Sequence, residues 1–405
     1  MRKRRIIIAI SVLLFIFLLT YGWLAFRDHK SYKNALPADA HLIIKLDVDK
    51  LIRKGIFYKI THPSNIFSKK SETGEKVDRP KNGLSIPANI FFFAKKNDPD
   101  RIYVTLPVED QDKAAAFLKR SLNIKDFSNE NGNWLGHTPD EKSEVIINND
   151  RILISYSTKK QLQKDGISNL MNSLMAQTPD ENLIASLGNT HGDVSALFEG
   201  LEVNISAEGN AIKVTGQSSN LDIRSVDIPL LGQFLQNNWN NDLEKLFNGS
   251  YQIQLQLKGV VQRTDTITTY EFNDDFEKIE QTALETYPVP GISLYLKTDS
   301  LAKNQKAVSL LNKNGLKLTA NELSVLHFSN TNAVSPSFSD SDYVFRLEVD
   351  FESFVPEINT LKNLKYMNKI KSLELIVTES EEGVYVYESN LVLKENVIGL
   401  LLDNI

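Results

Sequence analysis

A long uncharged run of apolar residues follows a short basic segment at the start of the chain. Residues 2–5 are all lysine or arginine, and residues 6–26 carry no charge. As a helix, this run of 21 residues spans roughly 31 Å, which matches the ~30 Å hydrocarbon core of a bilayer. We therefore predict an uncleaved transmembrane helix over 6–26, with residues 1–5 in the cytoplasm. A cleaved secretory signal is the alternative, but its apolar region is shorter and ends in small residues, whereas this run ends at Phe26.

Beyond a tether over residues 27–37, alternating apolar and polar residues predict many short strands. Strands are predicted at 41–48, 89–94, 101–106, 192–199, 201–207, 211–217, 251–262, 266–272, 291–296 and 343–349, and hairpins at 144–156, 316–328 and 371–392. Helical periodicity is predicted at 50–60, 110–122, 159–175, 229–247, 274–285, 301–311, 352–366 and 395–403. Strands outnumber helices and hairpins are frequent. This favours an α+β fold with antiparallel sheets over a doubly wound parallel sheet.

A five-residue pattern recurs where a strand leads into a helix. Residues 45–49 read basic, Leu, acidic, Val, Asp, and residues 346–350 repeat that order. A looser copy lies at 292–301, and a fourth junction of this kind lies at 106–110. The repeat predicts two related α+β units, over 38–180 and 285–405, on either side of a β-rich middle segment over 181–284.

The final aspartate of each copy is placed to cap the following helix, because its carboxylate can accept free N–H groups at the positive end of the helix dipole. The alternative is a divalent-cation site in which Asp47 and Asp49, two apart on a strand, share one face. The looser copy carries Lys297 where the first acid stands. A cation site would not tolerate this lysine, so we favour capping.

Composition excludes several classes of function. The chain has 46 Lys+Arg and 51 Asp+Glu, and its formal net charge is −5. A mildly acidic chain lacks the basic patch of a nucleic-acid-binding protein, so no nucleic acid partner is predicted. There is no cysteine, which excludes disulfides, thiolate catalysis and cysteine-ligated metals.

The sequence offers no catalytic, cofactor-binding or metal-binding residue that we can assign. No two of the six histidines have a ligand spacing such as H-x-H or H-E-x-x-H. Residues 190–193, Thr-His-Gly-Asp, place a histidine beside an aspartate, but a polar turn is the favoured interpretation. Residues 188–192 lack the Lys-Ser/Thr of a phosphate loop, and no G-x-S-x-G elbow is present. Asp340 and Asp342 lie in a serine-rich segment and are predicted to be solvated.

Two apolar segments have alternative interpretations. Residues 91–93 are three phenylalanines, which predict a strand buried on both faces, with a lipid-binding groove as the alternative. Residues 397–402 predict a helix docked on a sheet, with a partner-binding tail as the alternative.

The two ends of the chain resemble those of a family of membrane-anchored bacterial envelope proteins of uncharacterised function. The resemblance lies in residues 36–40, Leu-Pro-Ala-Asp-Ala, in the strand and the Leu-Asp-Val-Asp-Lys-Leu that follow up to residue 51, and in Lys-Glu-Asn before an apolar helix at 394–401. It implies a bacterial envelope protein and carries over no catalytic residue.

These observations predict a single-pass protein of the inner (cytoplasmic) membrane, with most of its chain in the periplasm. The expected function is a non-enzymatic binding or scaffold role in the cell envelope, without a cofactor. Its expected partners are the membrane, through the N-terminal helix, and an envelope protein. One alternative is a lipid-binding or lipid-transfer protein. Another is an enzyme with an unrecognised site, which carboxylates of shifted pKa gathered in one cleft would favour.

Overall fold

The structure is a computed structural model in which the chain divides into two compact units, unit 1 with residues 1–206 and unit 2 with residues 207–405. The residues it describes are 20–32, 36–37, 39–61, 82–130, 132–157, 159, 167, 170–172, 181–219, 251–272, 278–298, 301–313, 316–322, 325–330, 343–364, 366–380 and 383–403. The duplication predicted for 38–180 and 285–405, with a middle segment between them, stays a prediction.

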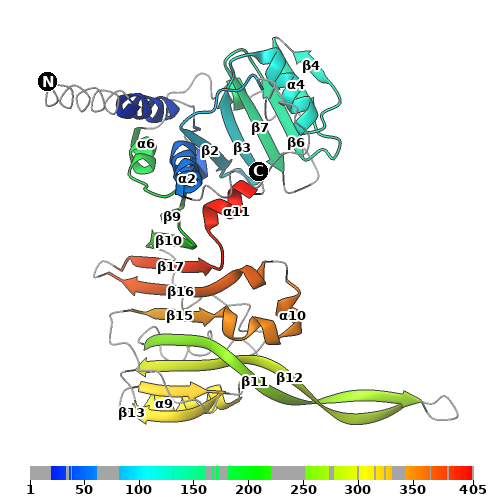
Figure 1. Cartoon of the computed structure of the whole chain (residues 1–405), viewed down its shortest axis with the longest axis vertical. Helices are drawn as coiled ribbons and strands as arrows, with labels where there is room; N and C mark the ends of the chain where they lie inside the picture. Colours follow the sequence, from blue (N-terminus) through cyan, green and yellow to red (C-terminus); the bar gives the residue numbers. More distant parts are fainter. Residues whose placement is uncertain are drawn as a thin grey trace, which may run out of the picture. The chain divides into compact units, whose positions relative to one another are not determined.

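Unit 1 is built on an antiparallel sheet whose strands follow the spatial order β9, β8, β1, β2, β3, β7, β6, β5 and β4. Figure 1 labels β2, β3, β7 and β6 of this sheet. The strands are β1 (Ala40–Asp47), β2 (Asn89–Lys95), β3 (Asp98–Pro107), β4 (Phe127–Glu130), β5 (Asn133–His137), β6 (Ser143–Ile147), β7 (Arg151–Ser157), β8 (Val194–Phe198) and β9 (Leu201–Glu208). Its named helices are α2 (Val48–Thr61), α4 (Gln111–Ser121) and α6 (Glu181–Gly188). The predicted helix over 159–175 lies largely outside the described residues.

Two apolar cores cover the two faces of this sheet. On one face, Ala115 and Leu118 of α4 pack against Val145 and Ile147 of β6. On the other face, Ile146 belongs to the cluster that contains Phe91 and Phe93 of β2. Strand β6 is therefore buried on both sides. Of the three phenylalanines of β2, Phe91 and Phe93 are buried, and Phe92 between them is partly exposed.

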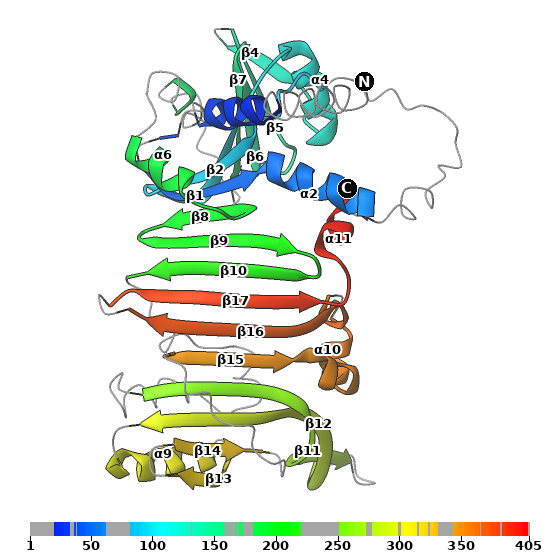
Figure 2. The same ribbon diagram turned by 60° about the vertical axis from the view of Figure 1, so that its left-hand side comes forward.

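Unit 2 holds a mixed sheet in the order β13, β14, β12, β11, β15, β16, β17 and β10, in which β11 and β15 pair in parallel and the other neighbours pair antiparallel (Figure 2). The strands are β10 (Ala211–Ser218), β11 (Tyr251–Phe272), β12 (Lys278–Thr298), β13 (Lys317–Glu322), β14 (Val325–Ser329), β15 (Phe345–Asp350), β16 (Ile370–Glu379) and β17 (Tyr385–Leu393). The core includes alternate residues of β11 and β12, such as Leu255 and Leu294, together with Leu311 of α9 (Leu301–Lys313). The predicted helix over 229–247 lies outside the described residues.

A two-stranded ribbon extends beyond the sheet of unit 2 (Figure 1). β11 pairs with β15 only over 253–257, and β12 pairs with β14 only over 293–297. The two long strands continue to pair with each other as far as Phe272 and Lys278. We call residues 260–272 of β11 and 278–290 of β12 the ribbon.

The structure corrects two predicted helices. Residues 278–285, within the helix predicted over 274–285, belong to β12, where pairing with β11 outweighs the helical preference of their Glu, Gln, Ala and Leu residues. The helix predicted over 352–366 is divided into short turns, because Pro356 at their centre lacks an N–H and cannot continue a helix. These turns are η2 (Phe351–Ser353), η3 (Val355–Glu357) and α10 (Asn359–Lys362), followed by η4 (Met367–Lys369); the last helix of the chain is α11 (Val397–Asp403).

The predicted fold class is wrong in two respects. The sheet of unit 2 is mixed rather than antiparallel, and no helix in the described part of the chain has the length and apolar character needed to cross a bilayer. Residues 6–19 of the membrane helix predicted over 6–26 lie outside the described residues, and the helical segment that follows them covers 20–31. Asn89 of β2 holds its end by donating hydrogen bonds to Asp28 Oδ1 (2.7 Å) and Ser31 Oγ (2.8 Å).

Candidate functional site

The conspicuous acidic residues of the repeat lie at the junction between β1 and α2. Asp47 ends the strand, and its Oδ1 accepts a hydrogen bond from the backbone N–H of Lys50 at 2.7 Å. Asp47 is therefore the capping residue, and the prediction that Asp49 caps the helix is wrong. Asp49 lies in the first helical turn and pairs with Arg27 at 2.9 Å. Because only Asp47 is on the strand, the two carboxylates do not share a strand face as a cation site would require.

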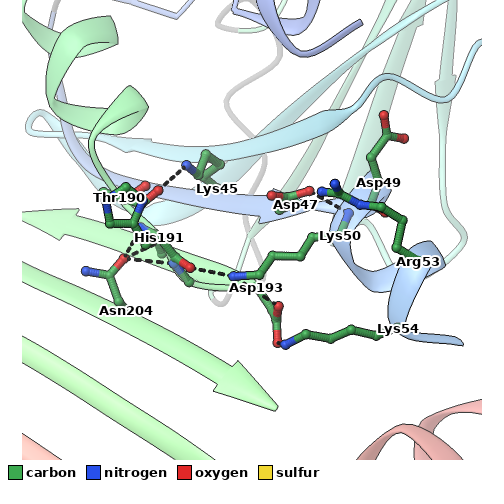
Figure 3. A network of polar contacts seen from close by, with 12 residues as sticks. Lys45, Asp47, Asp49, Lys50, Arg53, Lys54, Thr190, His191, Asp193 and Asn204 are labelled. Carbon is green, nitrogen blue, oxygen red and sulfur yellow. Dashed lines mark hydrogen bonds and ion pairs between the residues drawn. The ribbon is translucent and has the colours of Figure 1, made fainter. Parts of the chain in front are cut away.

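The turn at residues 190–193 meets this junction because β8, which follows the turn, pairs with β1 (Figure 3). The carboxylate of Asp193 is buried and lies 2.6 Å from Lys54 Nζ and 3.5 Å from Lys50 Nζ. Lys50 and Lys54 are one helical turn apart on α2, so both side chains reach the same acid. Residues 47–49 and 190–193, two motifs that stood apart in the sequence, are thus brought together.

Asn204 of β9 fixes the shape of this turn. Its Oδ1 accepts hydrogen bonds from the backbone N–H groups of His191 and Gly192, both at 3.2 Å, and from Ser195 Oγ at 2.8 Å. The carbonyl oxygen of His191 accepts from Lys50 Nζ, while its side chain lies on the exposed surface. The arrangement is a polar turn held by hydrogen bonds to Asn204, in which the carboxylate of Asp193 faces Lys50 and Lys54.

Lys45 is a member of the network that sequence reasoning missed. It lies on the core face of β1, 3% exposed, and its Nζ donates to the carbonyl oxygens of Leu187 (2.8 Å) and Thr190 (3.2 Å). Leu187 is near the C-terminus of α6, where the helix dipole is negative and favours a cation. Burial lowers the pKa of Lys45 and raises that of Asp47. The available signal was a single lysine inside the apolar alternation at 41–48.

The network joins β1, α2, β8 and the helical segment 20–31, and its three carboxylates either cap a helix or pair with a cation. Within the described residues, no group of three or more His, Asp or Glu side chains could hold a metal ion. Glu144 of β6 is a further carboxylate whose pKa burial raises. It lies four strand spacings from Asp47, roughly 19 Å, so the two perturbed carboxyls share no cleft. Asp340 and Asp342 lie outside the described residues.

Comparison with known proteins gives no family. No protein-family model matches the chain, and no curated protein matches it. One solved structure with some similarity is titled crystal form I of TP0453; it is 12% identical, the match covers 51% of this chain and 85% of that chain, and the TM-score is 0.28. A TM-score this low supports no conclusion about fold or function.

Proposed function

We propose that this protein has a non-enzymatic binding or scaffold role in the cell envelope. In this role it binds another polypeptide through the ribbon of unit 2. The envelope location is supported by the resemblance of the chain ends to anchored envelope proteins. The observation that carries the binding role is the ribbon, which extends past the last residues that pair with β14 and β15.

The ribbon has the properties of an interaction surface. An isolated two-stranded hairpin is marginally stable in water, so a long one gains from a partner. The outer edges of its strands present N–H and C=O groups that another chain can pair with. Its surface also exposes apolar side chains, with Tyr270 51%, Ile279 45% and Leu284 75% exposed.

The proposal predicts that binding can be removed without unfolding the protein. Val261 and Val289 face each other across the ribbon, so replacing residues 262–288 by Asn-Gly leaves a two-residue hairpin between them. None of the buried residues of the unit 2 core lies in the deleted stretch. We expect the variant to keep its cooperative urea unfolding transition. The amount of the polypeptide that copurifies stoichiometrically with the full-length chain should fall at least tenfold.

Two controls make this comparison decisive. Leu318 of β13 is 37% exposed and lies outside the ribbon, so Leu318→Ser should leave copurification unchanged. A photo-reactive amino acid placed at Tyr270, on β11 of the ribbon, should cross-link the same polypeptide that the shortened variant loses. Equal recovery with the intact and the shortened ribbon would refute the proposal.

A lipid-binding role is the second candidate, and a pocket of about 400 Å³ in unit 1 favours it. Trp23, Phe26 and Ile86 line this pocket and are 57%, 63% and 54% exposed. The Arg27 guanidinium lies 4.9 Å from the Trp23 ring centroid, and Lys30 also lines the pocket. Apolar walls beside cationic side chains suit a phospholipid with an anionic headgroup.

This second role predicts a fluorescence response of Trp23. Vesicles of phosphatidylglycerol should shift the tryptophan emission of the full-length chain to shorter wavelength, because the lipid excludes water from the exposed indole. Trp23→Phe should abolish the shift, whereas Trp134→Phe, which changes a tryptophan on β5, should preserve it. An unchanged emission spectrum in the wild type, or a shift that persists without Trp23, would exclude lipid binding at this pocket.

A further inference from the structure

The two outer edges of the ribbon differ in their capacity to pair. Ile292 of β12 donates its N–H to Asn330 Oδ1 (2.7 Å), and its carbonyl oxygen accepts from the Asn330 N–H (3.2 Å). Its backbone polar groups therefore point away from β11. Because this direction alternates along a strand, the even-numbered residues of β12 also point outward. Pro288 and Pro290 occupy two of these positions and lack an N–H, which weakens pairing along this edge near the sheet.

The outer edge of β11 within the ribbon contains no proline. The register shifts once, between Leu257 and Val260, where Gly259 adopts a φ of +74°. Beyond this bulge, Val260 stands opposite Pro290, so the outward-pointing residues of β11 are again those with even numbers. They are Val260, Gln262, Thr264, Thr266, Thr268, Tyr270 and Phe272. None of them is proline, so each keeps the N–H and C=O groups that pairing with another chain requires, and none of them is charged.

This edge is complementary to itself in one antiparallel register. Outward residues must meet outward residues, so two copies can centre their pairing on residue 265, 266, 267 or 268. Centring on Ile267 places Arg263 of each copy opposite Glu271 of the other. Centring on 265 opposes two copies of Asp265, and centring on 268 opposes Asp265 to Glu271, and like charges directly opposite are destabilising. Centring on 266 forms no charge pair.

We propose that the ribbon binds a second copy of this chain along the edge of β11, antiparallel and centred on Ile267, to form a four-stranded ribbon in the order β12, β11, β11, β12. This inference rests on the proposed function and names its partner. In this register, Thr266 lies opposite Thr268 and Thr264 opposite Tyr270, so the partly exposed aromatic ring of Tyr270 covers a threonine of the other copy. Arg263 already pairs with Asp265 on its own strand at 2.9 Å, and Glu271 of the second copy adds a further acid on the same face.

The absence of native cysteine allows a direct test on the full-length chain. Residues in a non-hydrogen-bonded antiparallel pair have Cα atoms about 4.5 Å apart, within the range of a disulfide. Ile267→Cys should therefore form a disulfide-linked dimer under mild oxidation. Leu284→Cys is the matched control, because β12 lies on the outside of the four-stranded ribbon, and it should stay monomeric. Equal cross-linking at both positions, or none at Ile267→Cys, would overturn the proposal.

Charge exchange tests the register independently. Sedimentation velocity of the full-length chain should show that Arg263→Glu and Glu271→Arg each raise the dimer dissociation constant about tenfold, and that the double variant recovers the wild-type value. Failure of the double variant to recover the wild-type dissociation constant would overturn the register.

The two proposals can fail separately. If the shortened ribbon loses a different polypeptide while Ile267→Cys forms no dimer, the proposed binding role is supported and pairing between two copies is refuted. If the shortened ribbon loses nothing, the proposed function itself fails.

Discussion

Replacing Glu144 by glutamine is expected to raise the free energy of unfolding of unit 1 by about 3 kcal/mol at pH 8 and to change it little at pH 4.5. Glu144 is 0% exposed, and neither of its carboxylate oxygens has a hydrogen-bond partner among the described residues. The groups that face it are the guanidinium of Arg101 on β3 and the imidazole of His137 on β5, whose Nδ1 lies 3.9 Å from Oε1. Burial raises the pKa of Glu144 from 4.5 to about 7, and Arg101 partly opposes this rise.

The sign of the pH effect follows from proton binding. Between pH 4.5 and about 7, the folded state holds a proton on Glu144 that the unfolded state has released. The free energy of unfolding therefore falls as the pH rises through this window. Above it the loss is constant, since a shift of about 2.5 pKa units at 1.36 kcal/mol each amounts to about 3 kcal/mol. Glutamine has no proton to lose, so its unfolding free energy should stay level where that of the wild type falls.

Urea unfolding at pH 4.5 and pH 8 measures this difference when it is followed through tryptophan fluorescence, with Trp23 and Trp239 replaced by phenylalanine so that Trp134 of unit 1 is the remaining emitter. Glu109→Gln provides the control, because Glu109 is exposed in the same unit and its replacement should change stability by less than about 0.5 kcal/mol at either pH. Parallel pH dependence of the wild type and Glu144→Gln would show that the carboxyl of Glu144 is not the group that titrates in this window.

Most strands of the fold could be predicted because they are encoded locally. The alternation at 41–48 and the turn between β6 and β7 specify a strand and a hairpin from neighbouring residues alone. Residues 278–285 could not be predicted in this way. Their composition favours a helix, and only the pairing with β11, up to 20 residues away in the sequence, makes them a strand.

The candidate site was predictable in its parts and not in its assembly. Residues 47–49 and 190–193 both attract attention as acidic motifs, yet about 140 residues separate them and only the pairing of β1 with β8 joins them. Lys45 illustrates the same limit. A lysine within an apolar strand pattern is ordinarily assigned to the solvated face, and the carbonyl oxygens that accept its hydrogen bonds belong to α6 and the turn after it. Distant backbone atoms therefore decide its burial.

Gly192→Ala is expected to destabilise unit 1 by about 3 kcal/mol, because the turn at 190–193 leaves no room for a side chain. A Cβ atom at Gly192 would lie 2.3 Å from the carbonyl oxygen of Val194 and 2.9 Å from the backbone nitrogen of Ile205. Both are backbone atoms of the β8–β9 pair, so they cannot rotate away as a side chain could. The turn must move, and this movement stretches the bond from the Asp193 N–H to the Ile205 carbonyl oxygen, now 2.7 Å.

The displacement should reach α2, because Asp193 links that helix to β8 through Lys54. Hydrogen exchange of the α2 amides should therefore accelerate in Gly192→Ala along with the loss of stability in urea. Gly188, at the end of α6, is the matched control. A Cβ there meets nothing within 4 Å in the part of the chain that the structure describes, so Gly188→Ala should be neutral or stabilising by less than about 1 kcal/mol. A Gly192→Ala protein as stable as Gly188→Ala would mean that the turn can shift freely. In that case, the contacts among Asn204, Asp193 and the lysines of α2 would not hold this part of unit 1 together.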